Sequence, residues 1–375
     1  MSVADLALQR NKYKHLSDEE WRWFLQQVEG RERTADKLPA FAAIEDWWYP
    51  VRLSCEQCSS ELAARYKAEI ITPYTLHHTP STMVDLTGGY GVDTYFLSEK
   101  FSHTDYVEQN AELCRIAAHN FANKTITIHN TSAEEFLASA GQYDLIFLDP
   151  ARRDSHGGKV FRLEDCTPNV VELLPTLLSH GKRLMIKLSP MLDLTQAVTS
   201  LSQVPWDLYV VAIKNEVKEV LLLSQELRAK SQEPTITAID MEKKDQAFVF
   251  TREEEQNCSL IHGDAPLNGE FLYEPNAAIL KAGAYKLVAQ RFGLRKLDVN
   301  THLYACDKLV PDFPGRAWRI TEKQDLKQAN VLCRNYPLTP EQLKKKLHLR
   351  DGGTAFVIGC RVTGKPTFFF AERVS

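Results

Sequence analysis

The chain has 375 residues, of which 44% are hydrophobic and 25% are charged, and its formal net charge is −4. These proportions are typical of a globular protein of two or three domains. We expect a cytoplasmic protein without a membrane partner, because no apolar stretch reaches membrane length, the N-terminus lacks a signal-peptide pattern, and eight scattered cysteines form no disulfide framework.

Residues 1–80 have helical patterning that is rich in tryptophan and charge, and we expect a helical cap or docking platform. Cys55 and Cys58 have the spacing of metal ligands, and His77-His78 follows later. A structural zinc site normally needs a second well-spaced pair, and adjacent histidines rarely reach one metal together. The sequence therefore predicts no metal.

A glycine turn at residues 82–94 is the most informative motif. An apolar strand ends at Asp85 and runs into Gly88, Gly89 and Gly91. Glycines there permit positive φ and let a ligand approach the backbone. The glycines alone would also suit a nicotinamide or flavin site, but a carboxylate at the strand end is unfavourable beside a pyrophosphate. Asp85 therefore favours a cationic, amine-bearing ligand such as S-adenosylmethionine (SAM).

The elements that follow predict an α/β fold with a doubly wound, seven-stranded Rossmann-like sheet. A helix over 92–100 leads to a strand that closes with Glu108, 23 residues after Asp85. An acid at the end of the second strand of a βαβ unit accepts hydrogen bonds from ribose hydroxyls. The remaining predicted elements are a helix over 111–123, strands over 125–129, 143–148 and 181–188, a helix start at 132–136, and an antiparallel pair over 208–213 and 216–223.

This order of elements resembles the class I SAM-dependent methyltransferases over about residues 55–225. In that family the first acid and the glycines hold the methionine portion of SAM, the second acid holds ribose, and residues after the third strand line the adenine. The resemblance implies these cofactor-binding residues: Gln57, Asp85, Thr87, Gly88, Gly89, Gly91, Asp93, Glu108, Gln109, Asn110, Ser132, Ala133 and Asp149. The chain departs from the family pattern at Thr87, where a first glycine is usual, and at 130–132, where the usual acid is missing.

The segment around Gln57, Glu56-Gln57-Cys58-Ser59-Ser60, is similar to the Glu-Gln-x-x-[Ser/Thr] helix of some nucleic-acid methyltransferases. In those enzymes this helix packs beside the methionine end of the cofactor. The alternative is a helix that is merely capped by a serine.

Asp149-Pro150-Ala151-Arg152-Arg153 stands where amino-group methyltransferases carry an Asn/Asp-Pro-Pro-aromatic motif. The resemblance implies Asp149, Pro150 and Arg152 as catalytic residues, with Asp149 accepting a hydrogen from the target amine. The second proline and the stacking aromatic are absent, so Arg152 and Arg153 could instead hold a phosphate or carboxylate of the substrate, or be a surface pair. Carbon methylation of a pyrimidine needs a cysteine nucleophile near the fourth or fifth strand. The fifth strand is followed by Ser189, and the only nearby thiol, Cys166, is expected to be an inert core or loop residue, so carbon methylation is disfavoured.

The C-terminal part of the chain is basic. Residues 276–375 contain 18 Lys and Arg against 8 Asp and Glu, a net charge of +10. Such an excess is the electrostatic footprint of a phosphate-backbone partner, and we expect Arg316 and Lys344, Lys345 and Lys346 to bind it. The alternative is a solvated helix face for the lysines and core positions for the interleaved aromatics. The tail resembles bacterial methyltransferases with a C-terminal THUMP-like domain, which implies RNA (tRNA or rRNA) as the partner.

The sequence thus predicts four regions: a helical region at 1–80, a methyltransferase domain at 81–225, a small ferredoxin-like subdomain at 226–275 and a basic THUMP-like domain at 276–375. The predicted function is SAM-dependent methylation of a nitrogen of RNA. Three alternatives stay open at this point: an RNA-binding module with a degenerate catalytic domain, an NAD(P)-dependent oxidoreductase, and a methyltransferase for a substrate other than RNA.

Overall fold

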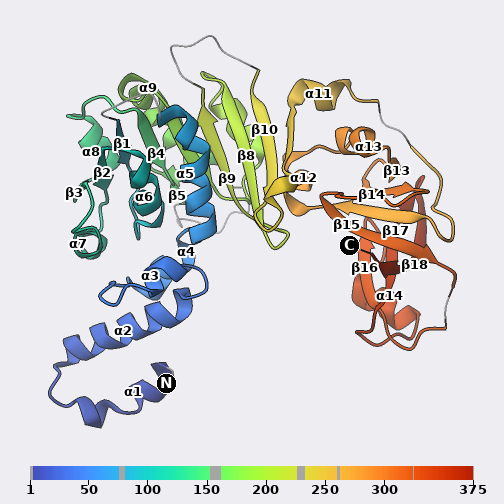
Figure 1. The fold of residues 1–375 in the computed structure, drawn as a ribbon, viewed down its shortest axis with the longest axis horizontal. Helices are drawn as coiled ribbons and strands as arrows, with labels where there is room; N and C mark the ends of the chain where they lie inside the picture. Colours follow the sequence, from blue (N-terminus) through green and yellow to red (C-terminus); the bar gives the residue numbers. More distant parts are fainter. Residues whose placement is uncertain are drawn as a thin grey trace. The chain divides into compact units, whose positions relative to one another are not determined.

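The structure is a computed structural model, and it describes residues 3–75, 81–152, 162–225, 233–259, 262–323 and 325–374. Two compact units divide the chain: Met1–Trp206 with Leu221–Gln232, and Asp207–Val220 with Glu233–Ser375 (Figure 1). No helix within the described ranges combines the length and the hydropathy that a membrane span requires.

The largest sheet has nine strands in the order β11-β10-β8-β9-β7-β4-β1-β2-β3. Strands β1, β2, β3, β4 and β7 pair in parallel, so their carboxyl ends share one edge of the sheet. The strand bounds are β1 Thr82–Asp85, β2 His103–Val107, β3 Ile126–His129, β4 Leu145–Leu148, β7 Leu184–Leu188, β8 Trp206–Ile213, β9 Glu216–Ser224, β10 Thr235–Asp240 and β11 Phe248–Thr251.

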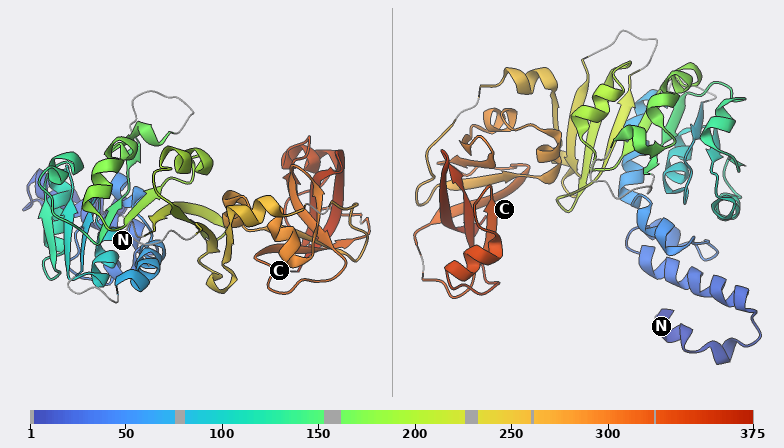
Figure 2. Two further views of the ribbon diagram at one scale, coloured as in Figure 1. Left: turned by 90° about the horizontal axis from the view of Figure 1, so that it is seen from above. Right: turned by 180° about the vertical axis from the view of Figure 1, so that it is seen from behind.

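Helices lie on both faces of this sheet (Figure 2), which explains why a strand such as β4 is apolar and buried at all four positions. The helices between these strands begin at polar caps: Asn110 caps α7, Ser132 caps α8 and Asn169 caps α9. The elements are α6 Val92–Leu97, η2 Ser98–Lys100, α7 Ala111–Asn120, α8 Ala133–Leu137, α9 Val170–His180 and α10 Leu194–Ser200, with β5 Ala151–Arg152 paired to β6 Cys166–Thr167 after η3 Leu163–Asp165.

The predicted subdomain at 226–275 is not a separate ferredoxin-like piece. Strand β10 pairs in parallel with β8 and antiparallel with β11, so both β10 and β11 extend the Rossmann-like sheet beyond its predicted seven strands. Strand β9 covers one edge of β8, and β10 pairs with the other edge. A helix, α11 Arg252–Asn257, follows β11.

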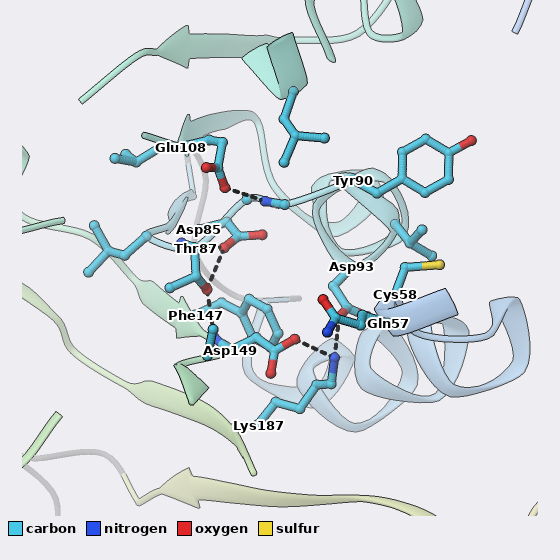
Figure 3. A pocket seen from close by; sticks show the side chains of 18 of the residues that line it. Gln57, Cys58, Asp85, Thr87, Tyr90, Asp93, Glu108, Phe147, Asp149 and Lys187 are labelled. Atoms are coloured by element: carbon cyan, nitrogen blue, oxygen red, sulfur yellow. Dashed lines mark hydrogen bonds and ion pairs between the residues drawn. The ribbon is translucent and has the colours of Figure 1, made fainter. Parts of the chain in front are cut away.

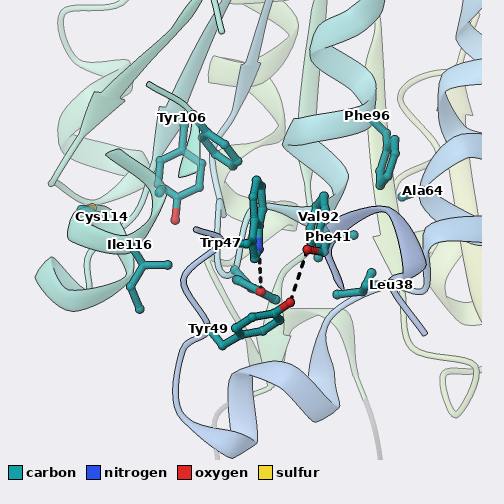
Figure 4. Close-up of a cluster of buried hydrophobic side chains, with 13 residues drawn as sticks. Leu38, Phe41, Trp47, Tyr49, Ala64, Val92, Phe96, Tyr106, Cys114 and Ile116 are labelled. Carbon is teal, nitrogen blue, oxygen red and sulfur yellow. Dashed lines mark hydrogen bonds between the residues drawn. The ribbon is translucent and has the colours of Figure 1, made fainter. Parts of the chain in front are cut away.

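The N-terminal region is helical, as predicted, and an aromatic cluster packs it against the nine-stranded sheet. Phe41 and Trp47 stack with ring centroids 4.1 Å apart, and the Trp47 indole donates a hydrogen bond to the Tyr90 hydroxyl at 2.9 Å (Figure 4). Tyr90 belongs to the glycine turn, so the turn is packed against this cluster. The helices are α1 Val3–Ala7, η1 Arg10–Tyr13, α2 Asp18–Thr34, α3 Pro39–Ala42, α4 Arg52–Gln57 and α5 Glu61–Thr75.

The second unit contains a seven-stranded sheet in the order β13-β14-β12-β15-β18-β17-β16. Two short helices follow residue 276, because Gly283 takes a left-handed conformation with φ of +86° and ends the first. The elements are η4 Lys244–Gln246, β12 Phe271–Pro275, α12 Ala277–Ala282, α13 Leu287–Phe292, β13 Arg295–Asp298, β14 Thr301–Cys306, β15 Gly315–Thr321, β16 Asn330–Arg334, α14 Pro340–Lys346, β17 Ala355–Val362 and β18 Lys365–Arg373.

The aromatic cluster gives a stability prediction. Phe41 is fully buried, and replacing it by alanine removes a ring from contact with Trp47, Tyr95 and Phe96. We expect Phe41→Ala to lower the free energy of unfolding by about 3–5 kcal/mol, measured by chemical denaturation. Leu53→Ala is the control, since Leu53 is 60% exposed and its loss should cost little. Equal effects of the two changes would contradict the packing described.

Candidate functional site

A cavity of about 300 Å³ opens at the carboxyl ends of β1, β2, β4 and β7, over the glycine turn (Figure 3). The turn is shaped by its residues. Gly89 and Gly91 have φ of +57° and +83°, a region that favours glycine. At Gly88 the limit is space, because an added Cβ would lie 2.2 Å from the Tyr106 ring. The Tyr106 hydroxyl in turn donates to the Gly89 carbonyl at 2.5 Å.

Asp85 is almost fully buried at the base of the turn, and both of its carboxylate oxygens accept hydrogen bonds from the protein. The backbone N–H of Thr87 donates to Oδ1 at 2.9 Å, and the Thr94 hydroxyl donates to Oδ2 at 2.5 Å. Burial raises the pKa of Asp85 to about 7. The two hydrogen bonds to Asp85 fix the shape of the turn.

Glu108 lies at the end of β2 and bridges two loops. Its Oε2 accepts the backbone N–H of Gly89 at 2.9 Å, and its Oε1 accepts that of Asn110 at 2.8 Å. A carboxylate held in this way presents a fixed acceptor at the cavity wall, which suits a ribose hydroxyl. Gln109 and Ala133 line the same side of the cavity.

Asp149 follows β4 and is held from two directions. Its backbone N–H donates to the Thr87 hydroxyl at 2.6 Å, which joins the glycine turn to the Asp-Pro motif. Its Oδ2 lies 2.5 Å from the Nζ of Lys187, at the end of the neighbouring strand β7. Lys187 Nζ also lies 3.6 Å from an oxygen of Asp93, and all three of these side chains line the cavity.

Beneath the cavity, Lys67 and Asp93 form a buried ion pair. Lys67 Nζ lies 3.1 Å from Asp93 Oδ1, and the Ser59 hydroxyl donates to Asp93 Oδ2 at 2.8 Å. Burial alone would raise the pKa of Asp93, but the ammonium groups of Lys67 and Lys187 hold it below its usual value. Asp93 is thus an ionised carboxylate in the lining of the cavity.

Most of the predicted cofactor residues lie together at this cavity: Gln57, Asp85, Thr87, Gly88, Gly89, Gly91, Asp93, Glu108, Gln109, Ala133 and Asp149. Asn110 and Ser132 are not among the lining residues, because their side chains cap α7 and α8. Pro150 lies beside the cavity without lining it, and Arg152 is in β5. The Arg152 side chain and the whole of Arg153 lie outside what the structure describes.

Among the described residues that line the cavity, Lys187 is the charged one that the sequence reasoning missed. It sits in the apolar run Leu184–Leu188, where a lysine near the carboxyl end of a predicted parallel strand is a usable signal. Its partner Asp149 lies on a different strand, however, and the adjacency of β4 and β7 was needed to pair them.

The predicted substrate-binding cations of the second unit are partly neutralised. Arg316 lies 3.8 Å from Glu274, which also accepts Arg334, and Lys344 pairs with Asp351. Lys345 and Lys346 are exposed at the end of α14. Three of the interleaved aromatics are core residues: Tyr304, Phe313 and Trp318.

The Cys55 and Cys58 pair has the character of protonated thiols. Burial raises the pKa of Cys55 to about 12 and also raises that of Cys58. Within the ranges that the structure covers, no three metal-ligating side chains converge, and His77 and His78 lie outside those ranges.

The cavity fits a cationic adenosyl compound. Even with Asp85 partly protonated near neutral pH, the acidic side chains that line it outnumber the one lysine, Lys187; they are Asp85, Asp93, Glu108 and Asp149. The glycine turn leaves the backbone open to a ligand, and Glu108 offers the acceptor that a ribose needs. When bound, SAM supplies a methyl group already activated by a positively charged sulfur.

The buried ion pair generates a prediction. We expect Lys67→Met to lower the free energy of unfolding by about 3–5 kcal/mol at neutral pH, because Asp93 keeps its charge and loses its closest cation. A carboxylate whose pKa is depressed in the folded state stabilises the fold above its unfolded pKa, and that contribution disappears as pH falls. The difference between the two proteins should therefore shrink on acidification, as measured by denaturation at several pH values.

The control for this prediction is Lys182→Met, which removes a half-exposed partner of Asp144 and should cost less than about 1 kcal/mol. A loss for Lys67→Met that stays constant down to acidic pH would show that the ion pair is not its cause.

Comparisons with known proteins agree with this site. Residues 271–314 match a ferredoxin-like domain family, rather than the predicted 226–275, and residues 315–373 match a family described as THUMP domain-like. An uncharacterized SAM-dependent methyltransferase of Mycobacterium tuberculosis (strain CDC 1551 / Oshkosh) is 22% identical over 355 residues, spanning 91% of this chain and 92% of its own. The crystal structure of a proposed methyltransferase from Porphyromonas gingivalis W83 is 32% identical with a TM-score of 0.83, and covers 96% of this chain and 92% of its own. The chain therefore belongs to the class I SAM-dependent methyltransferases that carry a C-terminal THUMP-like domain.

Proposed function

We propose that this SAM-dependent methyltransferase acts on RNA. The observation that carries the proposal is the THUMP-like match over 315–373, since THUMP domains are associated with delivering structured RNA to a fused enzyme. The exposed Lys345 and Lys346 at the end of α14 supply cations for a phosphate backbone. The paired states of Arg316 and Lys344 limit how many of the 18 basic residues are available for this contact.

Two features of the site bear on the acceptor atom. The Asp149-Pro150 motif favours a nitrogen, as the sequence predicts, because a carboxylate and a backbone carbonyl can orient an amine. The Lys187 ammonium, which contacts Asp149, favours a hydroxyl oxygen instead, because a hydroxyl gains negative charge as it loses its proton. The nitrogen is the prediction of the sequence, and the hydroxyl is the second candidate, which the contact between Lys187 and Asp149 supports.

Incubation of the pure protein with methyl-labelled SAM and either total RNA or total protein tests the substrate class. We expect label in RNA and none in protein. Label in protein alone would overturn the proposal while leaving the methyltransferase assignment intact.

The lysines of α14 provide a second test. We expect the double variant Lys345→Glu/Lys346→Glu to weaken RNA binding at low salt and to flatten the dependence of log K on log salt by about one for each lost phosphate contact. Filter binding or fluorescence anisotropy at several salt concentrations measures both quantities. Lys243→Glu/Lys244→Glu, in the exposed turn between β10 and β11, makes the same charge change as a control. Equal weakening by both pairs would assign the effect to net charge alone.

A further inference from the structure

We infer that the acceptor is a hydroxyl oxygen, the ribose 2′-hydroxyl of RNA, and that Asp149 and Lys187 are the catalytic pair that handles its proton and its charge. This inference rests on the proposed function, and it names the atom that the methyl group reaches.

The first step is the position of Lys187. Its side chain is 11% exposed, and its Nζ lies 2.5 Å from Asp149 Oδ2 inside the cavity (Figure 3). Asp149 is anchored through its backbone to Thr87, so the pair is fixed relative to the glycine turn. A fixed charge in a partly buried site acts more strongly on a reacting atom than the same charge in water does.

The second step is the sign of that charge. A nitrogen acceptor that attacks the methyl group gains positive charge, and an ammonium beside it opposes that change. A hydroxyl that loses its proton gains negative charge, and the same ammonium stabilises it. The charge of Lys187, taken separately from the carboxylates around it, therefore favours an oxygen acceptor over a nitrogen acceptor.

The third step concerns the surface offered to a base. Enzymes that methylate a flipped base stack it on an aromatic or apolar side chain. Among the described residues that line the cavity, the aromatic ones are Tyr90 and Phe147, which are 4% and 1% exposed. Ala151 stands at the second proline of the amino-group motif, and Arg152 stands where that motif has its stacking ring. A ribose needs no such ring.

The reaction balances with these residues. The hydroxyl proton passes to the Asp149 carboxylate, and the electron pair of the O–H bond stays on oxygen. That oxygen forms a bond to the methyl carbon while the carbon–sulfur bond breaks and its pair remains on sulfur. The Asp149 side chain is 39% exposed, so the proton can leave from it to water.

Product analysis of the unmodified protein is the direct test. RNA labelled with methyl-labelled SAM is hydrolysed in alkali, which cleaves only next to a free 2′-hydroxyl. We expect the label in alkali-resistant dinucleotides. Label in mononucleotides, on the base, would overturn the hydroxyl acceptor and leave RNA as substrate. Absence of label from every RNA pool would overturn the RNA substrate and the ribose acceptor together.

Variants of Lys187 test the residue roles. We expect Lys187→Met to lower kcat by about 10²–10³-fold, the loss typical when one preorganised donor to a developing oxyanion is removed. Lys187→Arg should recover part of this rate, because it keeps the charge. SAM binding by calorimetry should persist in both variants. Lys182→Met, outside the cavity, should keep full activity.

A nitrogen acceptor makes the opposite prediction, since loss of an opposing ammonium would leave kcat unchanged or raise it. Unchanged turnover in Lys187→Met with retained SAM binding would therefore remove Lys187 from the mechanism.

Discussion

The hydrogen bond from the Asp149 backbone to the Thr87 hydroxyl is the interaction on which the site depends. It joins the loop after β1 to the loop after β4, two neighbouring parallel strands that end at the same edge of the sheet. Thr87 in turn is oriented by Asp85, whose carboxylate accepts its backbone N–H. A glycine at position 87, the usual residue of the family, could not make the bond to Asp149. The departure from the family motif is thus a structural gain.

Contacts from the N-terminal region also hold the glycine turn and the cavity in place. The helical N-terminal region reaches the glycine turn through the Trp47–Tyr90 hydrogen bond, while Ser59 and Lys67 reach Asp93. These contacts hold α4 and α5 against the cavity, so that Gln57 and Cys58 can line it. The N-terminal region has no catalytic motif in its sequence, yet it completes the wall of the site.

The sequence predicted site residues that lie close together along the chain, and it missed those whose role depends on a contact between distant segments. Asp85, the glycines and Glu108 could be placed because strand, turn and strand follow one another within 30 residues. Lys187 could not, because its meaning comes from Asp149 on a neighbouring strand. The edge that accepts β10, and the ion pairs that neutralise Arg316 and Lys344, are likewise contacts between distant segments. The helix break at Gly283 was readable in principle, since glycine is the common left-handed end of a helix.

The Tyr106 ring occupies the place where any side chain at position 88 would begin, and its hydroxyl braces the carbonyl of the next residue. A larger residue at 88 would collide with the ring, and a residue without the hydroxyl at 106 would leave the Gly89 carbonyl without this hydrogen bond. A substitution at either position therefore changes what the other can accommodate, and we expect the two positions to co-vary among related sequences.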